Sequence, residues 1–294
     1  MIRVTITGSG TPIMVSGRAG PGVLVAVDDE VKLQFDAGRA TTLRLTEAGV
    51  ALPDLTAVFI THHHSDHLVG LSDLAMSRWL EQPANAAAPL EVVAPDGEAA
   101  TIAERLLDVW QTEMRMRAAH TGRPGPATIT VQRFVAPAAP QEIFAAGAVR
   151  VSAVQVRHEP VTPAVAYRVD AADGSVVISG DTAVCPALEE IAAGATVLVQ
   201  EAFRPGAVPT GLLSDPEALA AYHSEVGAVG EMAVRAGVGA LILTHLIPPP
   251  VSEEEKAGFV DDVRAAGFQG PVVVADDLNF VEVATRRRPD EPAT

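Results

Sequence analysis

The residues most capable of chemistry form one short cluster, a His-x-His-x-Asp-His pattern at residues 62–67. The cluster follows an apolar run and precedes a helical pattern, so we expect it to occupy a loop between a strand and a helix. Alternate side chains at a strand end can point into one cavity. His62 and His64 can therefore share one metal ion, while Asp66 and His67 can reach a second ion beside it. Imidazole and carboxylate ligands suit zinc, and also iron or manganese.

Three further metal-capable residues, His158, Asp181 and His245, each come directly after an apolar strand-like run. Open α/β sheets build their sites at the carboxyl ends of strands, so we expect these side chains to converge on the histidine cluster. Because four of the chain's eight histidines fall within one window of six residues, a chance polar loop is a poor explanation. The predicted metal ligands are His62, His64, Asp66, His67, His158, Asp181 and His245. We expect them to hold two divalent ions, Zn²⁺ first, with Mn²⁺ or Fe²⁺ as alternatives.

Short apolar runs that end in turn signals predict strands, and longer stretches of helical periodicity predict helices. The expected strands are 2–7, 23–27, 31–35, 58–61, 91–94, 149–156, 164–169, 176–179, 197–200, 240–244 and 272–275. The expected helices are 67–80, 98–117, 187–193, 216–236 and 253–266, the fourth capped by Asp215. This order predicts an α/β fold of two β-rich halves that pack together with their helices outside. We expect one domain over residues 1–285 and a flexible tail over residues 286–294.

The charge balance opposes a nucleic-acid partner, because 37 acidic and 21 basic residues give a net charge of −16. The basic run Arg286-Arg287-Arg288 lies in the expected tail. The single cysteine, Cys185, excludes an intramolecular disulfide and fits a reducing compartment. The sequence shows no signal peptide and no apolar run near the roughly 20 residues of a membrane span. We therefore expect a cytoplasmic protein without a membrane partner, compatible with a homodimer.

Five motifs, taken in order, resemble those of the metallo-β-lactamase-fold hydrolases over about the whole chain. They are Phe35-Asp36-Ala37-Gly38, the histidine cluster, His158, Asp181 and His245. The resemblance implies a four-layer αββα sandwich with a dinuclear site at one edge. In the family pattern one metal is held by His62, His64 and His158, the other by Asp66, His67 and His245, and Asp181 bridges both. Asp36 supports the loop in that pattern and is not a ligand.

A second group of motifs resembles the tRNA 3′-end processing endonucleases, RNase Z, and their phosphodiesterase and arylsulfatase relatives. It comprises Gln200-Glu201-Ala202, His223-Ser224-Glu225 and the opening Gly8-Ser9-Gly10-Thr11-Pro12. By this resemblance Glu201 orients His223, which touches the substrate and donates a hydrogen bond or a proton to its oxygen. The alternative is a surface acid at a strand end and a histidine at a helix start. Together with Asp66, which is also a predicted metal ligand, Glu201 and His223 are the catalytic residues we expect.

Two departures from the RNase Z pattern bear on the substrate. The long Gly/Pro-rich arm that grips tRNA in those enzymes is missing, because only about twenty residues separate His158 from Asp181. The strongly negative charge also opposes RNA binding. We therefore expect a small-molecule ester as the substrate and do not expect tRNA as a partner. The segment 98–117 resembles a substrate-covering segment of the sulfatase-like relatives; we expect the nearby His120 on an exposed loop, and His63 in the variable position of its motif.

The resemblance implies a hydrolase in which a water bridging two metal ions, roughly 3.5–4 Å apart, is acidified to hydroxide and attacks the substrate. The first hypothesis is a phosphodiesterase acting on a small diester, and the second is an arylsulfatase-like sulfate ester hydrolase. A lactonase or other carboxylic-ester hydrolase is the third hypothesis. It ranks last because lactonases of this fold usually surround the third histidine differently from Arg157-His158-Glu159. A non-enzymatic binding module would lack ligands, and none is missing in this sequence.

Overall fold

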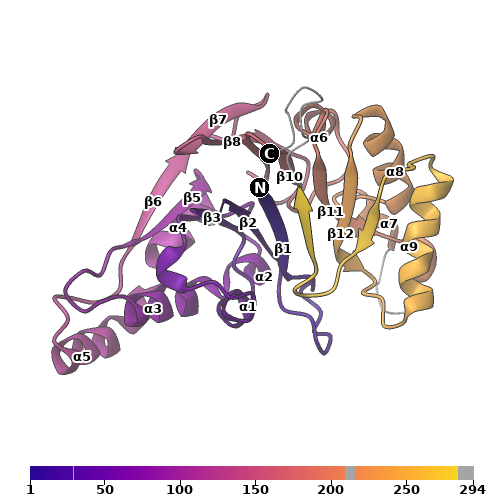
Figure 1. Ribbon diagram of the computed structural model, residues 1–294. Helices are drawn as coiled ribbons and strands as arrows, with labels where there is room; N and C mark the ends of the chain where they lie inside the picture. The colour runs from indigo at the N-terminus through magenta and orange to yellow at the C-terminus, as the bar shows by residue number, and fades with distance from the viewer. Residues whose placement is uncertain (29, 209–215, 284–294) are drawn as a thin grey trace, which may run out of the picture.

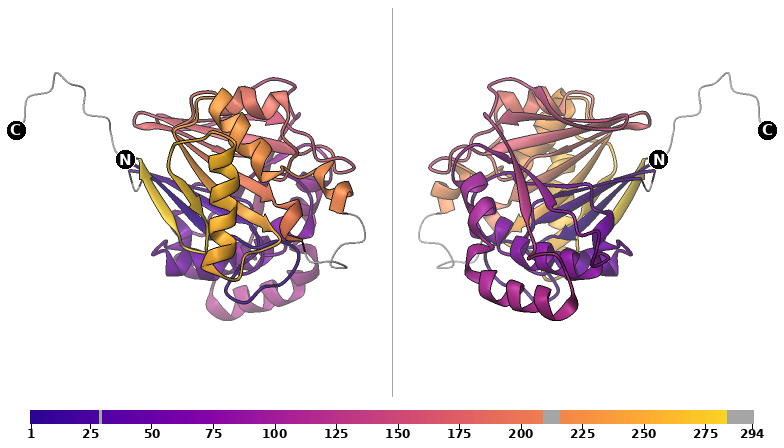
Figure 2. Two further views of the ribbon diagram at one scale, coloured as in Figure 1. Left: turned by 90° about the vertical axis from the view of Figure 1, so that its right-hand side faces the viewer. Right: turned by 90° about the vertical axis from the view of Figure 1, so that its left-hand side faces the viewer.

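The computed structural model describes residues 1–28, 30–208 and 216–283. In these residues two seven-stranded sheets lie face to face, and helices cover the outer face of each sheet (Figure 1). The two side views in Figure 2 show the same layers, with helices on both outer faces. The predicted four-layer αββα sandwich is therefore confirmed.

The first sheet comes mainly from the amino-terminal half of the chain, and the second from the carboxy-terminal half. In spatial order the first sheet contains β14 (Phe280–Val283), β1 (Ile2–Gly8), β2 (Gly22–Val27), β3 (Val31–Phe35), β4 (Ala57–Phe59), β5 (Leu90–Pro95) and β6 (Ile129–Phe134). The second contains β13 (Val272–Val274), β12 (Ala240–Ile247), β11 (Val197–Phe203), β10 (Gly174–Ile178), β9 (Val165–Ala171), β8 (Val149–Gln155) and β7 (Gln141–Ala146). The last strand, β14, returns to the first sheet and pairs antiparallel with β1, so the carboxy-terminal half of the chain contributes a strand to the sheet of the amino-terminal half.

The helices follow the same division between the two halves. The first sheet is covered by α1 (Thr41–Glu47), α3 (Leu71–Glu81) and α4 (Glu98–Arg105), with α5 (Gln111–Thr121) outside them. The second sheet is covered by α6 (Pro186–Ala192), α8 (Val226–Arg235) and α9 (Glu253–Ala265). The short elements in the connections are α2 (Ser65–Leu68), α7 (Pro216–Ala220), η1 (Leu52–Asp54), η2 (Asp108–Trp110) and η3 (Pro205–Ala207).

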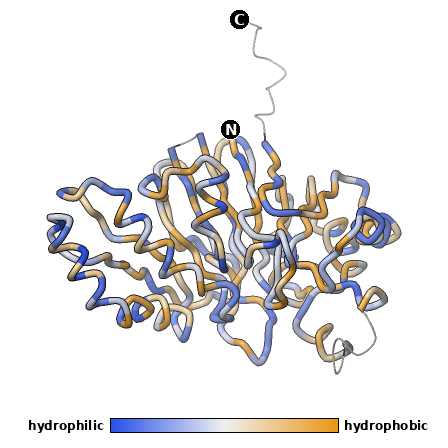
Figure 3. Tube along the Cα trace, turned by 90° about the horizontal axis from the view of Figure 1, so that it is seen from below, coloured by the Kyte–Doolittle hydropathy of each residue, from blue (hydrophilic) through white to orange (hydrophobic). Residues whose placement is uncertain are grey.

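The core between the sheets is built mostly from aliphatic side chains, as expected for a chain with 4% aromatic residues. The aromatic exceptions gather in one place: the rings of Phe35 and Phe59 are stacked 4.8 Å apart, and Tyr167 from the second sheet lies 5.5 Å from each. Since helices cover the outer faces, central strands are buried on both sides, and all seven residues of β11 are buried. In Figure 3 the hydrophobic segments accordingly gather in the middle of the molecule.

Three of the five predicted helices are interrupted, so their prediction as single helices is wrong. The stretch 67–80 is divided between α2 and α3, 98–117 between α4, η2 and α5, and 216–236 between α7 and α8. The first break is at Gly70, where a Cβ atom would lie 2.0 Å from the carbonyl oxygen of Gly38. At the third break the backbone leaves the helix to contact β11, where the Phe203 N–H donates to the carbonyl oxygen of Ser224. Contacts between distant segments thus override the helical periodicity, and the predicted cap, Asp215, lies outside the described residues.

Most predicted strands are confirmed within one to three residues at each end, including the hairpin of β2 and β3. The sequence did not predict α1, β6, β7 or β14. Strands β6 and β7 are the far edges of their sheets and are only partly buried, so their sequences lack a continuous apolar run. The single domain over residues 1–285 stays a prediction, and the expected tail lies outside the described residues. In the described part, the helices are too short or too polar to cross a membrane.

The second sheet contacts the strand end that precedes the histidine cluster. The Tyr167 hydroxyl on β9 donates to the carbonyl oxygen of Ile60 at 2.7 Å, and the Val165 N–H donates to that of Thr61 at 3.0 Å. Gly180 also approaches closely, since a Cβ atom there would lie 2.8 Å from Cβ of Thr61, and its φ of 59° favours glycine. The start of the histidine cluster is therefore fixed relative to both sheets.

We predict that Tyr167→Phe lowers the free energy of unfolding by about 1–3 kcal/mol, because the buried carbonyl group of Ile60 loses its donor. Urea denaturation monitored by circular dichroism measures the change. Tyr222→Phe is the matched control, since no hydrogen bond of the Tyr222 hydroxyl is found in the described part of the chain. Equal stability of Tyr167→Phe and the wild type would contradict this role.

Candidate metal centre

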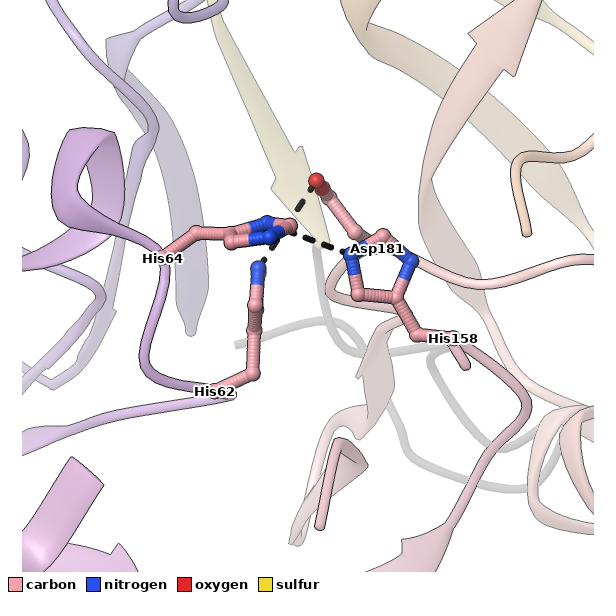
Figure 4. Close-up of side chains that lie close together, drawn as sticks. All are labelled: His62, His64, His158 and Asp181. Carbon is pink, nitrogen blue, oxygen red and sulfur yellow. Dashed lines mark hydrogen bonds and ion pairs between the residues drawn. The ribbon is translucent and has the colours of Figure 1, made fainter. Parts of the chain in front are cut away.

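Loops at one end of the two sheets bring the predicted ligands together. The first half of the chain supplies His62, His64, Asp66 and His67, and the second supplies His158 after β8, Asp181 after β10 and His245 in β12. In one group, His62, His64, His158 and Asp181, the ligand atoms lie within 4.8 Å of one another, and the same holds for Asp66, His67 and His245. Figure 4 shows His62 and His64 on one side facing His158 and Asp181 on the other. All seven predicted ligands thus meet, in groups that match the pattern implied by the resemblance.

The Asp181 carboxylate lies between the two groups. Its Oδ2 atom is 3.9 Å from Nε2 of His62 and 3.4 Å from Nε2 of both His67 and His245. Oδ2 of Asp66 lies 3.6 Å and 3.5 Å from the same nitrogens of His67 and His245. Asp181 therefore approaches members of both groups, whereas Asp66 approaches only the second.

Contacts on the outer side of the imidazoles determine which nitrogen faces the centre. Nδ1 of His67 lies 2.7 Å from Oδ2 of Asp36, and Nδ1 of His158 lies 2.8 Å from a backbone carbonyl oxygen. Nδ1 of His62 lies 2.9 Å from the Thr61 hydroxyl. In all three rings the Nε2 atom is left for the interior, which is how outer partners orient metal-binding histidines. Asp36 thus contacts a predicted ligand from behind and belongs to neither group.

Two residues at the centre hold a left-handed backbone conformation, His245 with φ of 46° and Asp36 with φ of 56°. His245 is the extra residue of a β-bulge, because its neighbours on either side both remain paired with β11. Bulges re-aim a side chain, and strained residues of this kind gather at functional sites. The predicted strand end at residue 244 is therefore too early, since β12 continues through the bulge to Ile247.

Burial keeps three of the imidazoles neutral. It lowers the pKa of His62 well below the ordinary value, and the neighbouring His67 adds to the effect. Burial also lowers the pKa of His64 and His158. A metal ion binds the neutral form of imidazole, so these three side chains are in the protonation state that a metal ion requires.

Opposite charges determine the direction of the pKa shifts of His67 and Asp181. Burial alone would lower the pKa of His67, but Asp181 and Asp36 raise it well above the ordinary value. Burial alone would raise the pKa of Asp181, but His245 and His67 hold it well below the usual range. The carboxylate is therefore ionised, and it supplies the negative charge that two cations in one small volume need.

Several buried polar atoms at the centre have no hydrogen-bond partner in the described part of the chain. They are Nε2 of His62, His67 and His245, and Oδ2 of Asp66. Each buried polar atom without a partner costs roughly 1–3 kcal/mol, so four that face one small volume are suited to a bound cation. The donors are imidazole nitrogens and carboxylate oxygens, the set that divalent transition metals take. The residues therefore fit a divalent metal centre.

A buried carboxylate and imidazole stand beside this centre. Oε1 of Glu201 lies 3.3 Å from Nδ1 of His223 and accepts the N–H groups of Ser224, at 2.7 Å, and Thr182, at 3.3 Å. Burial alone would lower the pKa of His223, but Glu201 raises it to about 9. The ring of His223 also stacks on that of His245, with centroids 5.7 Å apart. Glu201 therefore favours the protonated form of the imidazole that lies beside the metal centre.

The surface alternative for this pair does not fit its burial. Glu201 is 1% exposed and His223 is 6% exposed. His223 precedes the first residue of α8 by three positions, in the turn that contacts β11, so it does not occupy a helix start. Burial raises the pKa of Glu201, and the nearby His223 opposes that rise.

Two further histidines lie outside the groups described above. His63 is half-buried, and His120 is exposed within α5 rather than on the loop that we expected. The sequence also gave no role to Thr61, Thr182 and Ser224. Thr61 donates to Asp36, the N–H groups of Thr182 and Ser224 donate to Glu201, and the Ser224 hydroxyl donates to the carbonyl oxygen of Thr182. Each of the three directly adjoins a motif residue, and this adjacency is the only signal that could have found them.

The family comparison agrees with the geometry. The family model described as Beta-lactamase superfamily domain matches residues 34–246, a span that contains every predicted metal ligand. The chain belongs to the β-lactamase superfamily. As a member of that superfamily it is a metal-dependent hydrolase that acts on ester bonds, with a divalent metal centre at the edge of the sandwich.

Curated relatives of this β-lactamase-superfamily enzyme carry the name Ribonuclease Z. The protein from Mycobacterium sp. (strain KMS) is 36% identical over 284 residues, which cover 96% of each chain. That from Mycobacterium marinum is 33% identical over 287 residues, covering 97% of this chain and all of the relative. Among solved structures, human tRNase Z, short form, aligns with a TM-score of 0.69 over 96% of this chain and 99% of its own, at 20% identity. The metallo-β-lactamase-fold protein YhfI from Bacillus subtilis aligns with a TM-score of 0.70 over 96% and 100%, also at 20% identity.

These relatives correct our expectation about the substrate. The expectation of a small-molecule ester, with tRNA excluded as a partner, is wrong, because relatives that match along nearly their whole length are ribonucleases by name. The two premises were the missing arm and the net charge. The aligned relatives are almost the same length as this chain, so they too leave little room for a long additional arm. A net charge is a sum over the whole surface and says nothing about any local patch.

We predict that the wild type binds about two divalent ions per chain and that Asp181→Ala retains less than one. Without Asp181, the two cations would lose the carboxylate that lies between them and would repel each other. Elemental analysis after gel filtration measures both values. Asp170→Ala removes an exposed carboxylate at the other end of the second sheet and should keep the wild-type content. A full metal content in Asp181→Ala would refute the shared position of this residue.

Proposed function

We propose that this protein is a zinc-dependent phosphodiesterase of the ribonuclease Z type, which cleaves tRNA precursors at their 3′ ends. The observation that carries the proposal is the buried Glu201–His223 pair against the metal centre. A metal centre alone can catalyse the hydrolysis of many kinds of ester. An imidazole beside it that can act as a general acid is suited to a poor leaving group, such as a ribose hydroxyl, which needs a proton as it departs. The names of the full-length relatives support RNA as the source of that leaving group.

The proposed division of labour follows from the contacts. The ligands named above would hold two divalent ions, which when bound activate water and polarise a phosphoryl oxygen. His223 donates its proton to the departing oxygen and stabilises charge there. Glu201, itself held by two backbone N–H groups, keeps the imidazole protonated and oriented. Asp66 faces the same volume with an unpartnered oxygen, and we assign it a double role, as a metal ligand and as a contact to the reacting water.

Zinc is the proposed metal because the ligand set consists of imidazoles and carboxylates in a buried pocket. Manganese and iron take the same donors, and elemental analysis of protein purified without added metal distinguishes the three. The single cysteine, Cys185, belongs to neither group of ligands, so a thiolate is not part of the proposed site.

A substrate panel tests the proposed function directly. Metal-loaded protein is incubated with a tRNA precursor that carries a 3′ trailer and, in parallel, with an aryl phosphodiester, an aryl sulfate and a lactone. We expect endonucleolytic cleavage of the precursor and slower hydrolysis of the aryl phosphodiester. Hydrolysis of the sulfate or the lactone with an intact precursor would replace this proposal with the sulfatase or the lactonase hypothesis.

We predict that His223→Ala lowers kcat on the RNA by about 10²–10⁴, the usual range for a lost general acid, with folding and metal content unchanged. Glu201→Gln should cause a smaller loss, and the double variant should resemble His223→Ala because Glu201 acts through His223. Arg150→Ala is the control, since this exposed side chain lies at the start of β8, the end opposite His158.

The leaving group separates proton donation from simple binding. An aryl leaving group of low pKa needs little protonation, so the His223→Ala defect should be much smaller on the aryl phosphodiester than on RNA. Equal defects on both substrates would remove the acid role and leave His223 as a binding residue. An unchanged kcat on RNA would remove both roles.

A further inference from the structure

The segment formed by η2 and α5 projects from the body of the protein. In Figure 1 α5 lies at the lower left, outside α3, and α2 with two predicted ligands lies toward the same lower side. Both views of Figure 2 show α5, in magenta, at the bottom of the molecule. Its contact with the core is narrow, because Met114 and Ala118, one turn apart, are its buried residues. The rest of the helix surface is therefore available to a partner.

This projecting segment exposes large apolar side chains. Val109 is 82% exposed, Trp110 is 44% exposed and Met116 is 70% exposed. An exposed tryptophan is costly to leave in water and is typical of surfaces that bind a flat or apolar partner. The three residues lie within eight positions, so they are gathered on this one projecting segment.

The same segment is less acidic than the protein as a whole. Residues 108–123 contain three arginines, Arg115, Arg117 and Arg123, and two acidic residues, Asp108 and Glu113, whereas the whole chain has 37 acidic against 21 basic residues. Arg117 pairs with Glu113, but Arg115 is exposed and forms no ion pair within the part of the chain that the structure describes. At helical spacing, Met116 lies opposite the buried Met114–Ala118 stripe, and Arg115 lies between the two.

We propose that the exposed face of η2 and α5 binds the RNA substrate, with Arg115 contacting phosphate and Trp110 contacting a base. The inference rests on the proposed RNA cleavage and adds to it a binding surface separate from the metal centre. An unpaired guanidinium and an exposed indole on one projecting segment suit RNA, since stacking on an aromatic ring tolerates any base and arginine neutralises the backbone. A purely apolar protein partner would leave the guanidinium of Arg115 without a matching group. This surface supplies a grip in a chain that lacks the long arm between His158 and Asp181.

Steady-state kinetics on two substrates tests the surface. Trp110→Ala and Arg115→Ala should each raise KM for the tRNA precursor by about tenfold, and leave hydrolysis of bis(4-nitrophenyl) phosphate unchanged. Arg115→Ala should also reduce the slope of log(kcat/KM) against log salt by about 1, because one phosphate contact is lost. Arg115→Lys keeps the charge and should restore most of the salt slope. Arg150→Ala is the matched control, since this half-exposed arginine lies at the start of β8, the end opposite His158.

The outcomes distinguish the two proposals. If the wild type cleaves the precursor and both alanine variants keep its KM, the surface is overturned while the proposed function stands. If the variants lose equal activity on both substrates, the effect is structural and the surface is overturned. If Trp110→Ala dissociates a dimer in sedimentation velocity, the patch belongs to a second copy of the chain instead. A wild type that hydrolyses only the small diester would overturn both proposals.

Discussion

The carboxylate of Asp36 holds together the parts on which the site depends. It accepts the N–H and the hydroxyl of Thr61, each at 2.8 Å, and lies 2.7 Å from Nδ1 of His67. One buried side chain at the end of β3 thus fixes both ends of the histidine cluster, at a residue held in the left-handed region. In a buried setting such charge-assisted contacts are strong, and a lost one leaves unpaired polar groups. A residue that need not touch metal therefore decides where the metal ligands stand.

The second constraint is the close approach of backbone segments around Asp66. A Cβ atom at Gly38 would lie 2.4 Å from the carbonyl oxygen of Asp66, and one at Gly20 would lie 2.9 Å from it. These glycines, with Gly70, let three loops meet more closely than any side chain would allow. The compact centre, with four unpartnered polar atoms facing inward, is a product of this backbone packing.

The sequence predicted the chemical groups of the site better than the backbone conformations that position them. Histidines and aspartates at strand ends were sufficient to predict the seven ligands, because strand ends of one sheet meet at one edge and the two sheets bring their edges together at the site. The bulge at His245 and the turn at His223 were not predictable, since both arise from pairing with β11, a distant segment. The periodicity of residues 216–236 correctly indicated helix, but the structure divides this stretch into two helices, α7 and α8. The inference from charge to substrate failed for another reason, since a total of −16 is a sum over the whole chain and says nothing about any local patch.

The division of the ligands between the two halves of the chain has a mechanical consequence. Four ligands come from the half that ends at β6, and three come from the half that begins at β7. The chain crosses between these halves near the exposed Val135, and it crosses back when β14 pairs with β1. A single nick after β6 would therefore yield two fragments that stay bound through β14 and the shared core. Each fragment alone would hold an incomplete set of ligands, so metal uptake would report reassembly of the fragments, much as a reporter split into two inactive pieces does.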